Sequence, residues 1–308
     1  MTRNLCRTLV AAAALTLAAA PALSQRLDTT PRIGVISAFE PEWEDLRAAT
    51  EGVEEHLDNG VTFVTGTLEG REVVLFLSGI GVVNTAMTTQ LALDHFNIEA
   101  LVFSGIAGGV DPALSIGDIV VAEQWGPYFH MVLARENADG YTVPPFYGKP
   151  FANFGMMFPQ PVDVRREGGT AVEEKFWFPS DPALLAAARK AAETVDLKRC
   201  DDEGTCLTNT PKVTVGGNGV SGSAFVDNAA FRQYVSDTFE AKVLDMESAA
   251  AAQVAYANQV PFVAIRSLSD LAGGGEGANE LGTFFRIAAA NSAAMVRAVL
   301  KASATASD

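Results

Sequence analysis

The sequence is poor in histidine, cysteine and basic residues, and these shortages exclude several kinds of site. Its 308 residues include three scattered histidines and three cysteines, and none of them has the spacing of metal ligands. The GxxxxGK[ST] pattern of a phosphate-binding loop is also missing from the sequence. We therefore expect no metal ion and no cofactor.

The net charge is −15, because 37 acidic residues outnumber 22 lysines and arginines. An excess of negative charge repels nucleic-acid phosphates and anionic membrane surfaces. We therefore expect neither nucleic acid nor membrane lipid as a partner of the mature chain. A small neutral or cationic ligand fits this charge better.

The apolar run near the N-terminus is short for a membrane span. It covers residues 9–20, whereas a bilayer core needs roughly 20 apolar residues. Arg3 and Arg7 precede the run, and the small residues Ala22 and Ser24 follow it, as in a cleavable signal peptide. We expect residues 1–24 to be removed by cleavage after Ser24, which makes the mature chain periplasmic or secreted. A membrane anchor is the alternative.

Cys200 and Cys206, the two cysteines of the expected mature chain, bracket the polar loop 201–205. In an oxidising compartment, two cysteines this close in a loop can form a disulfide. Their spacing and the lack of a nearby histidine argue against a zinc site. The sequence predicts a disulfide, or two free thiols if the chain is not exported.

Short apolar runs alternate with segments of helical spacing, which predicts a largely parallel or mixed twisted sheet. The expected strands are 32–37, 73–77, 100–103, 213–215, 243–246 and 260–267, and the expected helices are 42–47, 84–96, 183–195, 247–256 and 281–302. We expect one α/β domain, residues 25–308, with a three-layer α/β/α architecture.

The alternation is interrupted at about residues 125–180. This segment is rich in proline, glycine and aromatic residues and predicts a long, irregular loop insertion. Its aromatic content favours an ordered segment over a disordered one.

The segment 79–84 is similar to a dinucleotide-binding turn, but Asn84 replaces the third glycine and no acidic residue ends the following strand. We therefore do not expect a nicotinamide dinucleotide.

Acidic residues follow several of the expected strands. Glu40 and Glu42 come after the first strand, Asp245 and Glu247 come at the end of a later one, and Asp270 follows the last. Ligands of open parallel sheets bind outside the carboxyl ends of the strands. We therefore expect these acids to converge on one site.

Several blocks of the sequence, in this order, resemble the 5′-methylthioadenosine/S-adenosylhomocysteine nucleosidases of the nucleoside phosphorylase superfamily. The blocks are Ile33-Gly34-Val35-Ile36 followed by Glu42, Ser78-Gly79-Ile80-Gly81, Ser104-Gly105-Ile106-Ala107-Gly108-Gly109, Val220-Ser221-Gly222-Ser223-Ala224-Phe225, Asp245-Met246-Glu247 and Ile265-Arg266-Ser267-Leu268-Ser269-Asp270. The resemblance runs from about residue 32 to residue 301. It implies the fold of that superfamily, a homodimer, and a purine nucleoside as the small-molecule partner.

The resemblance also implies an activity and its catalytic residues. Such an enzyme hydrolyses the N-glycosidic bond of an adenine nucleoside, which is 5′-methylthioadenosine, S-adenosylhomocysteine or 5′-deoxyadenosine. The departing base must be protonated and water must be delivered to C1′. By resemblance, Asp270 protonates N7 of adenine, Ser269 holds Asp270, and Glu42 activates the water.

Further residues take substrate-binding roles by the same resemblance. Glu247 binds the ribose hydroxyls, Met246 packs under the sugar, Phe225 stacks on the base, and the backbone of Val226 reads the edge of the base. Arg266 lies near the water, and Ile106, Ala107 and Gly108 line the site. The family usually has serine or threonine at Ile106 and aspartate at Ser223, so two polar contacts differ here.

Four of these residues also have a purely structural interpretation. Glu42 alone fits the first turn of a helix, and Asp270 alone fits a turn cap. Met246 and Phe225 alone fit an apolar core. Glu247 is the exception, because a carboxylate between an apolar run and an alanine-rich helix is costly to bury without a partner.

Two other functions fit the resemblance. One is a phosphorylase that uses phosphate in place of water, although Glu42 would repel a phosphate anion and Phe103 and Ser104 stand where such enzymes carry an arginine. The other is a secreted protein that binds or stores nucleosides without turnover. An acid aimed at N7 has little use in a pure binder.

Overall fold

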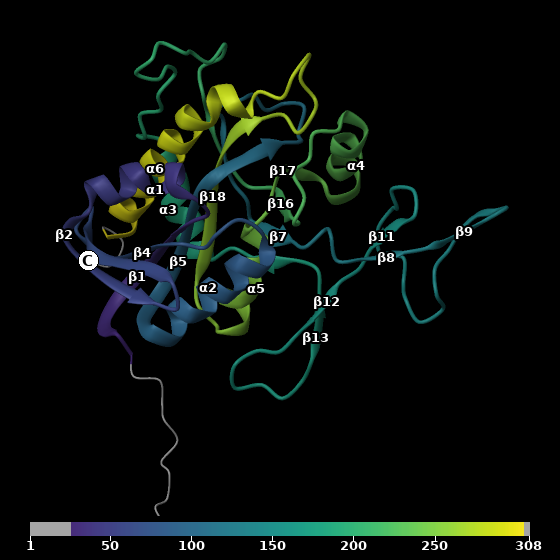
Figure 1. Ribbon diagram of the computed structural model, residues 1–308, viewed down its shortest axis with the longest axis horizontal. Coiled ribbons are helices and arrows are strands. Elements are labelled where there is room, and N and C mark those ends of the chain that lie inside the picture. The colour runs from purple at the N-terminus through teal and green to yellow at the C-terminus, as the bar shows by residue number, and fades with distance from the viewer. Residues whose placement is uncertain (1–25, 305–308) are drawn as a thin grey trace, which may run out of the picture.

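A twisted sheet of twelve strands runs through the centre of the molecule, and helices cover both of its faces (Figure 1). The structure is a computed structural model that describes residues 26–304. The strands of this sheet are β1 (Asp28–Ser37), β2 (Glu51–Asp58), β3 (Val61–Leu68), β4 (Arg71–Leu77), β5 (Phe96–Gly109), β6 (Ile119–Val121), β7 (Gln124–Gly126), β14 (Phe178–Pro179), β15 (Val213–Val215), β16 (Asn218–Ser221), β17 (Ala241–Asp245) and β18 (Phe262–Asp270). The helices are α1 (Glu40–Ala49), α2 (Val82–His95), α3 (Pro182–Ala192), α4 (Ala229–Phe239), α5 (Ser248–Ala257) and α6 (Leu281–Ala304). The predicted signal peptide, residues 1–24 with its cleavage after Ser24, lies outside the described residues.

The sheet is mixed. Its main path has the order β14-β7-β16-β17-β5-β1-β4-β3-β2, while β18 pairs with β5 and β6, and β15 pairs with β6. β1 is parallel to β4 and β5, and β18 is parallel to β5, whereas β17 is antiparallel to β5. Helices α1, α3 and α6 cover one face and α2 and α5 cover the other (Figure 1). This confirms the predicted three-layer α/β/α fold.

A separate apolar core lies on each face of the sheet. On one face, α1, α3 and α6 bury side chains such as Trp43, Leu184 and Val296 against the strands. On the other face, α2 and α5 pack closely through small residues such as Ala92 and Ala252. None of the helices in residues 26–304 combines the length and the hydropathy that a bilayer crossing requires.

β5 brings the beginning and the end of the chain together at the centre of the sheet. It pairs with β1 through residues 96–103 and with β18 through residues 101–108. The apolar runs of β1 and β18 are continuous because helices cover both faces of these strands. Because all three strands are parallel, their carboxyl ends lie at the same edge of the sheet.

The sequence analysis missed the β2–β3 hairpin, β16 and α4. β2 (EGVEEHLD) is a mostly exposed edge strand, and its charged residues hide the alternation by which strands are usually recognised. α4 buries a narrow stripe of Phe231, Val235 and Phe239, and the side chain of Asn228 accepts a hydrogen bond at its N-terminus.

The insertion at 125–180 consists of short strands and is not irregular throughout. β7 and β14 join the central sheet, and the segment between them forms small two-stranded sheets that project from the body (Figure 1). These pair β8 (Met131–Leu133) with β11 (Met157–Pro159), β9 (Arg135–Asn137) with β10 (Gly140–Thr142), and β12 (Val162–Val164) with β13 (Glu173–Lys175). Tyr128, Phe151 and Phe176 anchor the insertion by ring contacts with Phe239 of α4.

Cys200 and Cys206 form a disulfide that closes the loop 201–205. The loop lies beside the beginning of α6, where Arg286 donates a hydrogen bond to Glu203 over 3.2 Å. The disulfide therefore stiffens a loop that contacts the last helix of the fold.

Candidate active site

A cavity of about 290 Å³ lies at the carboxyl ends of β1, β5, β17 and β18. All of the predicted site residues except Arg266 line it. Its lining residues are Ala38, Phe39, Glu42, Ile80, Ile106, Ala107, Gly108, Ala224, Phe225, Val226, Leu244, Asp245, Met246, Glu247, Ser269, Asp270 and Leu281. The expected convergence of the acids that follow the strands is therefore present for Glu42, Asp245, Glu247 and Asp270, whereas Glu40 does not line the cavity.

Glu42 enters the cavity from the first turn of α1. Its carboxylate accepts hydrogen bonds from the backbone N–H groups of Ala38, at 2.6 Å, and Ile106, at 2.8 Å. Burial raises the pKa of Glu42 above its ordinary value, while the charge of Arg266 and these N–H groups oppose the rise. The carboxylate is thus held rigidly with little water around it, which suits a base that takes a proton from one bound molecule.

Asp270 is the last residue of β18, and its side chain is almost completely buried. Ser269 Oγ donates to Asp270 Oδ2 over 2.9 Å, and the Ala272 N–H donates to Oδ1 over 2.8 Å. Burial raises the pKa of Asp270 against the effect of these donors. A raised pKa favours the protonated form, which is the form that a general acid requires.

Glu247 lies in the turn between β17 and α5. Its Oε1 accepts a hydrogen bond of 2.7 Å from the N–H of Gly81, which has a φ of +93° at the start of α2. Burial and the neighbouring charge of Asp245 raise its pKa to about 7. Within residues 26–304 its Oε2 accepts no hydrogen bond, so this oxygen can accept one from a ligand.

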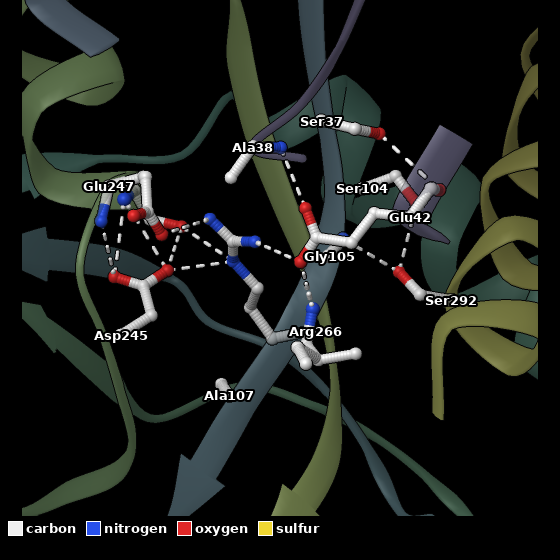
Figure 2. A network of polar contacts seen from close by, with 12 residues as sticks. Ser37, Ala38, Glu42, Ser104, Gly105, Ala107, Asp245, Glu247, Arg266 and Ser292 are labelled. Carbon is white, nitrogen blue, oxygen red and sulfur yellow. Dashed lines mark hydrogen bonds and ion pairs between the residues drawn. The ribbon is translucent and has the colours of Figure 1, made fainter. Parts of the chain in front are cut away.

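Arg266 lies beneath the cavity, between the glutamates (Figure 2). It is completely buried on β18, and its Nε is 2.7 Å from Asp245 Oδ2. Its Nη1 is 3.9 Å from Glu42 Oε1, and its Nη2 is 3.8 Å from Glu247 Oε2. The guanidinium therefore supports both carboxylates from behind and does not line the cavity, in contrast to the other predicted site residues.

The position of Arg266 depends on a glycine in the neighbouring strand. A Cβ atom at Gly105 of β5 would lie 1.7 Å from Arg266 Nη1 and 2.7 Å from Glu42 Oε1. Any larger residue at this position would displace the guanidinium and the carboxylate together. Gly105 thus belongs to the site because it lacks a side chain. Its role was not predicted from the sequence.

Apolar side chains form the rest of the cavity. Phe225 is 57% exposed at its mouth, whereas Val226 is buried. Phe39, Ile80 and Leu281 add apolar surface from three separate loops and helix ends. Their lining role was not predicted, because no local sequence signal marks it. A flat aromatic base fits such walls.

The charged side chains that line the cavity, within the part of the chain that the structure describes, are all acidic. They are unsuited to a phosphate anion, which requires cationic or N–H donors. In residues 26–304 no group of three or more His, Cys, Asp and Glu side chains is arranged to hold a metal ion.

Comparison with known proteins gives the family. The phosphorylase superfamily matches residues 32–301 of the chain. The 5′-methylthioadenosine/S-adenosylhomocysteine nucleosidase of Psychromonas ingrahamii is 34% identical over 243 residues, which are 79% of this chain and 87% of that protein. The chain belongs to this nucleosidase family of the phosphorylase superfamily.

Solved nucleosidase structures share the fold. The enzyme of Neisseria meningitidis, in complex with methylthio-immucillin-A, has a TM-score of 0.65 and 29% identity over 88% of this chain and 98% of its own. The enzyme of Colwellia psychrerythraea, in complex with adenine, has a TM-score of 0.66 and 28% identity over 88% and 95% of the two chains. Both the family and the fold predicted from the sequence are confirmed.

Proposed function

We propose that the protein is a purine nucleosidase that hydrolyses the N-glycosidic bond of an adenine nucleoside. The observation that carries the proposal is the convergence of the buried carboxylates of Glu42, Glu247 and Asp270 on one cavity whose walls are mostly apolar. The substrate is 5′-methylthioadenosine, S-adenosylhomocysteine or 5′-deoxyadenosine. The names of the related nucleosidases support this substrate class.

In the proposed reaction, the C1′–N9 bond breaks and its electrons move onto the purine. Asp270 gives a proton to N7 as the negative charge develops, and burial raises its pKa, which favours the protonated form that this step needs. The base thus leaves as neutral adenine, which requires less energy than the departure of a purine anion.

Water attacks C1′ from the side of Glu42, which accepts the proton that the water loses. Two backbone N–H groups hold the Glu42 carboxylate in place before the substrate binds, so little reorganisation is needed in the transition state. Glu247 accepts hydrogen bonds from the ribose hydroxyls, and its negative charge stabilises the positive charge that develops on the sugar.

The walls of the cavity hold the base and the sugar. Phe225 stacks on adenine, the backbone of Val226 reads its edge, and Met246 packs under the ribose. Ile106, where the family usually has a hydroxyl, gives the water one polar neighbour fewer. All four residues line the cavity, which supports the contacts that the resemblance implies.

We also infer that the mature chain is exported after cleavage behind Ser24 and works as a homodimer. The disulfide between Cys200 and Cys206 supports an oxidising compartment. Exposed apolar residues beside the cavity support the homodimer. The N-terminal sequence of the chain recovered from a periplasmic extract tests the export: an intact Met1 would contradict it.

The decisive experiment measures adenine release from 5′-methylthioadenosine by the purified mature chain, with and without phosphate. Phosphate-independent release is expected, and Glu42→Gln and Asp270→Asn should each lower kcat/KM by about 10²- to 10⁴-fold. Asp118→Asn is the matched control, because Asp118 is equally buried but does not line the cavity.

Two outcomes would overturn the proposal. Release that requires phosphate would make the protein a phosphorylase. Binding of purine nucleosides without release of adenine from any of them would make it a binding or storage protein.

A further inference from the structure

Asp245, to which the proposed reaction assigns no step, belongs to the polar network around Arg266 and lies there beside Glu247 (Figure 2). Its buried carboxylate accepts hydrogen bonds from the hydroxyls of Ser221 and Ser248 and from the backbone N–H of Glu247. Arg266 Nε lies 2.7 Å from its Oδ2. These contacts connect Asp245 directly to Glu247 and to Arg266.

The contact with Asp245 determines where Arg266 points. A guanidinium group is planar and rigid, so an anchor at Nε fixes the direction of both Nη atoms. Here they face Glu42 at 3.9 Å and Glu247 at 3.8 Å. Neither Nη atom has a hydrogen-bond partner among the described residues, although Arg266 is completely buried. The guanidinium charge is therefore shared by both glutamates.

The network contains more negative than positive charge. The charged groups that face Glu247 are Asp245 from β17, Arg266 from β18 and Glu42 from α1. Three carboxylates around one buried guanidinium cannot all ionise without a large cost, so the pKa of the least stabilised one rises. Among the described residues, Glu247 has one N–H donor, whereas Glu42 has two. Burial and the charge of Asp245 raise the pKa of Glu247 to about 7.

We propose that Asp245 is a positioning residue for the hydrolysis, which aims Arg266 at the two glutamates and places its own negative charge beside Glu247. Its effect on turnover rests on the proposed function. Its effect on Glu247 can be measured without turnover. A failure of this proposal can therefore be distinguished from a failure of the proposed function.

The test is Asp245→Asn, which keeps the shape of the side chain and removes its charge. A misdirected Arg266 should lower kcat/KM for 5′-methylthioadenosine by roughly 10²-fold. Without the nearby anion, the acidic limb of the pH profile of kcat/KM should move to lower pH by roughly one unit. Carbon-13 NMR titration of the Glu247 carboxyl in the substrate-free protein, assigned with Glu247→Gln, should show the same shift.

Two further variants separate the effects of the Asp245 charge and of the orientation of Arg266 from a general disturbance of the fold. Asp118→Asn removes another buried carboxylate, which accepts backbone N–H bonds from Ser115 and Lys212, and should leave the titration of Glu247 unchanged. Ser248→Ala removes a hydroxyl that contacts both Asp245 and Arg266 but changes no charge. It should lower kcat/KM and leave the pH limb in place.

An unchanged pH limb and an unchanged titration of Glu247 in Asp245→Asn would overturn the proposal, whatever the loss of rate. If Asp245→Asn does not fold, Ser248→Ala tests the proposal in its place. An unaltered kcat/KM of Ser248→Ala would show that this network does not orient Arg266. If the wild-type chain releases no adenine, the proposed function fails, while the NMR titration still tests the link between Asp245 and Glu247.

Discussion

At the residue scale, burial gives the cavity carboxylates their chemistry and also lowers the stability of the fold. Glu42, Glu247 and Asp270 all have raised pKa values because the walls of the pocket remove water from them. An ionised carboxylate in such a place destabilises the folded state relative to the unfolded chain. A functional site of this kind is therefore a place where the protein can be made more stable by a substitution that ends its activity.

Glu247 should make the stability of the protein fall as the pH rises. Its pKa is about 7 in the folded state, against an ordinary value of 4.5 for a glutamate exposed to water, so the folded state binds the proton more tightly. The free energy of unfolding therefore decreases between about pH 4.5 and pH 7, by up to about 3 kcal/mol, and the loss persists above pH 7. Glu247→Gln should raise Tm relative to wild type at pH 8 and much less at pH 5, as measured by thermal unfolding. Glu54→Gln, on the exposed edge strand, is the control, and an equal change in Tm at both pH values for Glu247→Gln would contradict the prediction.

At the element scale, the disulfide loop beside α6 adds stability without reaching the cavity. Cys200→Ser/Cys206→Ser should lower the free energy of unfolding by roughly 2 kcal/mol, because a closed loop of this length restricts the unfolded chain. Activity at 25 °C should be unchanged, because the residues of this loop do not line the cavity. Chemical denaturation measures the loss, and reduction of the wild-type protein should reproduce it. Equal stability of the reduced and oxidised forms would contradict the prediction.

The central elements could be predicted because their environment is uniform. β1 and β18 are covered on both faces and therefore appear as continuous apolar runs, and acids placed just after such strands mark the edge at which a ligand binds. The edge strand β2 is exposed and charged, so it gave no such pattern. The proline, glycine and aromatic content of the insertion 125–180 predicted an irregular segment. Its strands are only two or three residues long and are therefore too short to give a recognisable pattern.

Within the site as well, some features could be predicted from the sequence and others could not. Glu42, Glu247 and Asp270 could be located by their position after strands. The burial of Arg266 beneath the cavity could not be predicted, because it depends on the missing side chain of Gly105 in the neighbouring strand. Ile80 and Leu281 reach the cavity through loop geometry, which sequence periodicity does not report.

At the scale of the whole molecule, the mouth of the cavity lies beside an exposed apolar patch. Val83 and Met87, one turn apart on α2, and Ile80 and Phe225 are each more than half exposed. Ile80 and Phe225 also line the cavity. A contiguous apolar patch of this kind is typical of an interaction surface, and the proposed homodimer would cover it.

The double variant Val83→Lys/Met87→Lys should convert the dimer into a monomer, because it places two like charges on each side of a symmetric interface. Size-exclusion chromatography with light scattering measures the mass. Gln233→Lys, on the exposed side of α4, should leave the mass unchanged. A monomeric wild-type protein would contradict the prediction.

The pairing of β1 and β18 with β5 also determines when the protein becomes active during folding. Glu42 and Asp270 come from opposite ends of the described chain, so the site exists only after the most distant segments have joined. Contacts between residues so far apart in sequence form slowly, because a long chain loop must close first. The rate at which adenine release recovers after dilution from denaturant therefore reports the closure of the central sheet. The recovery of the helical circular dichroism signal reports the earlier formation of local helices.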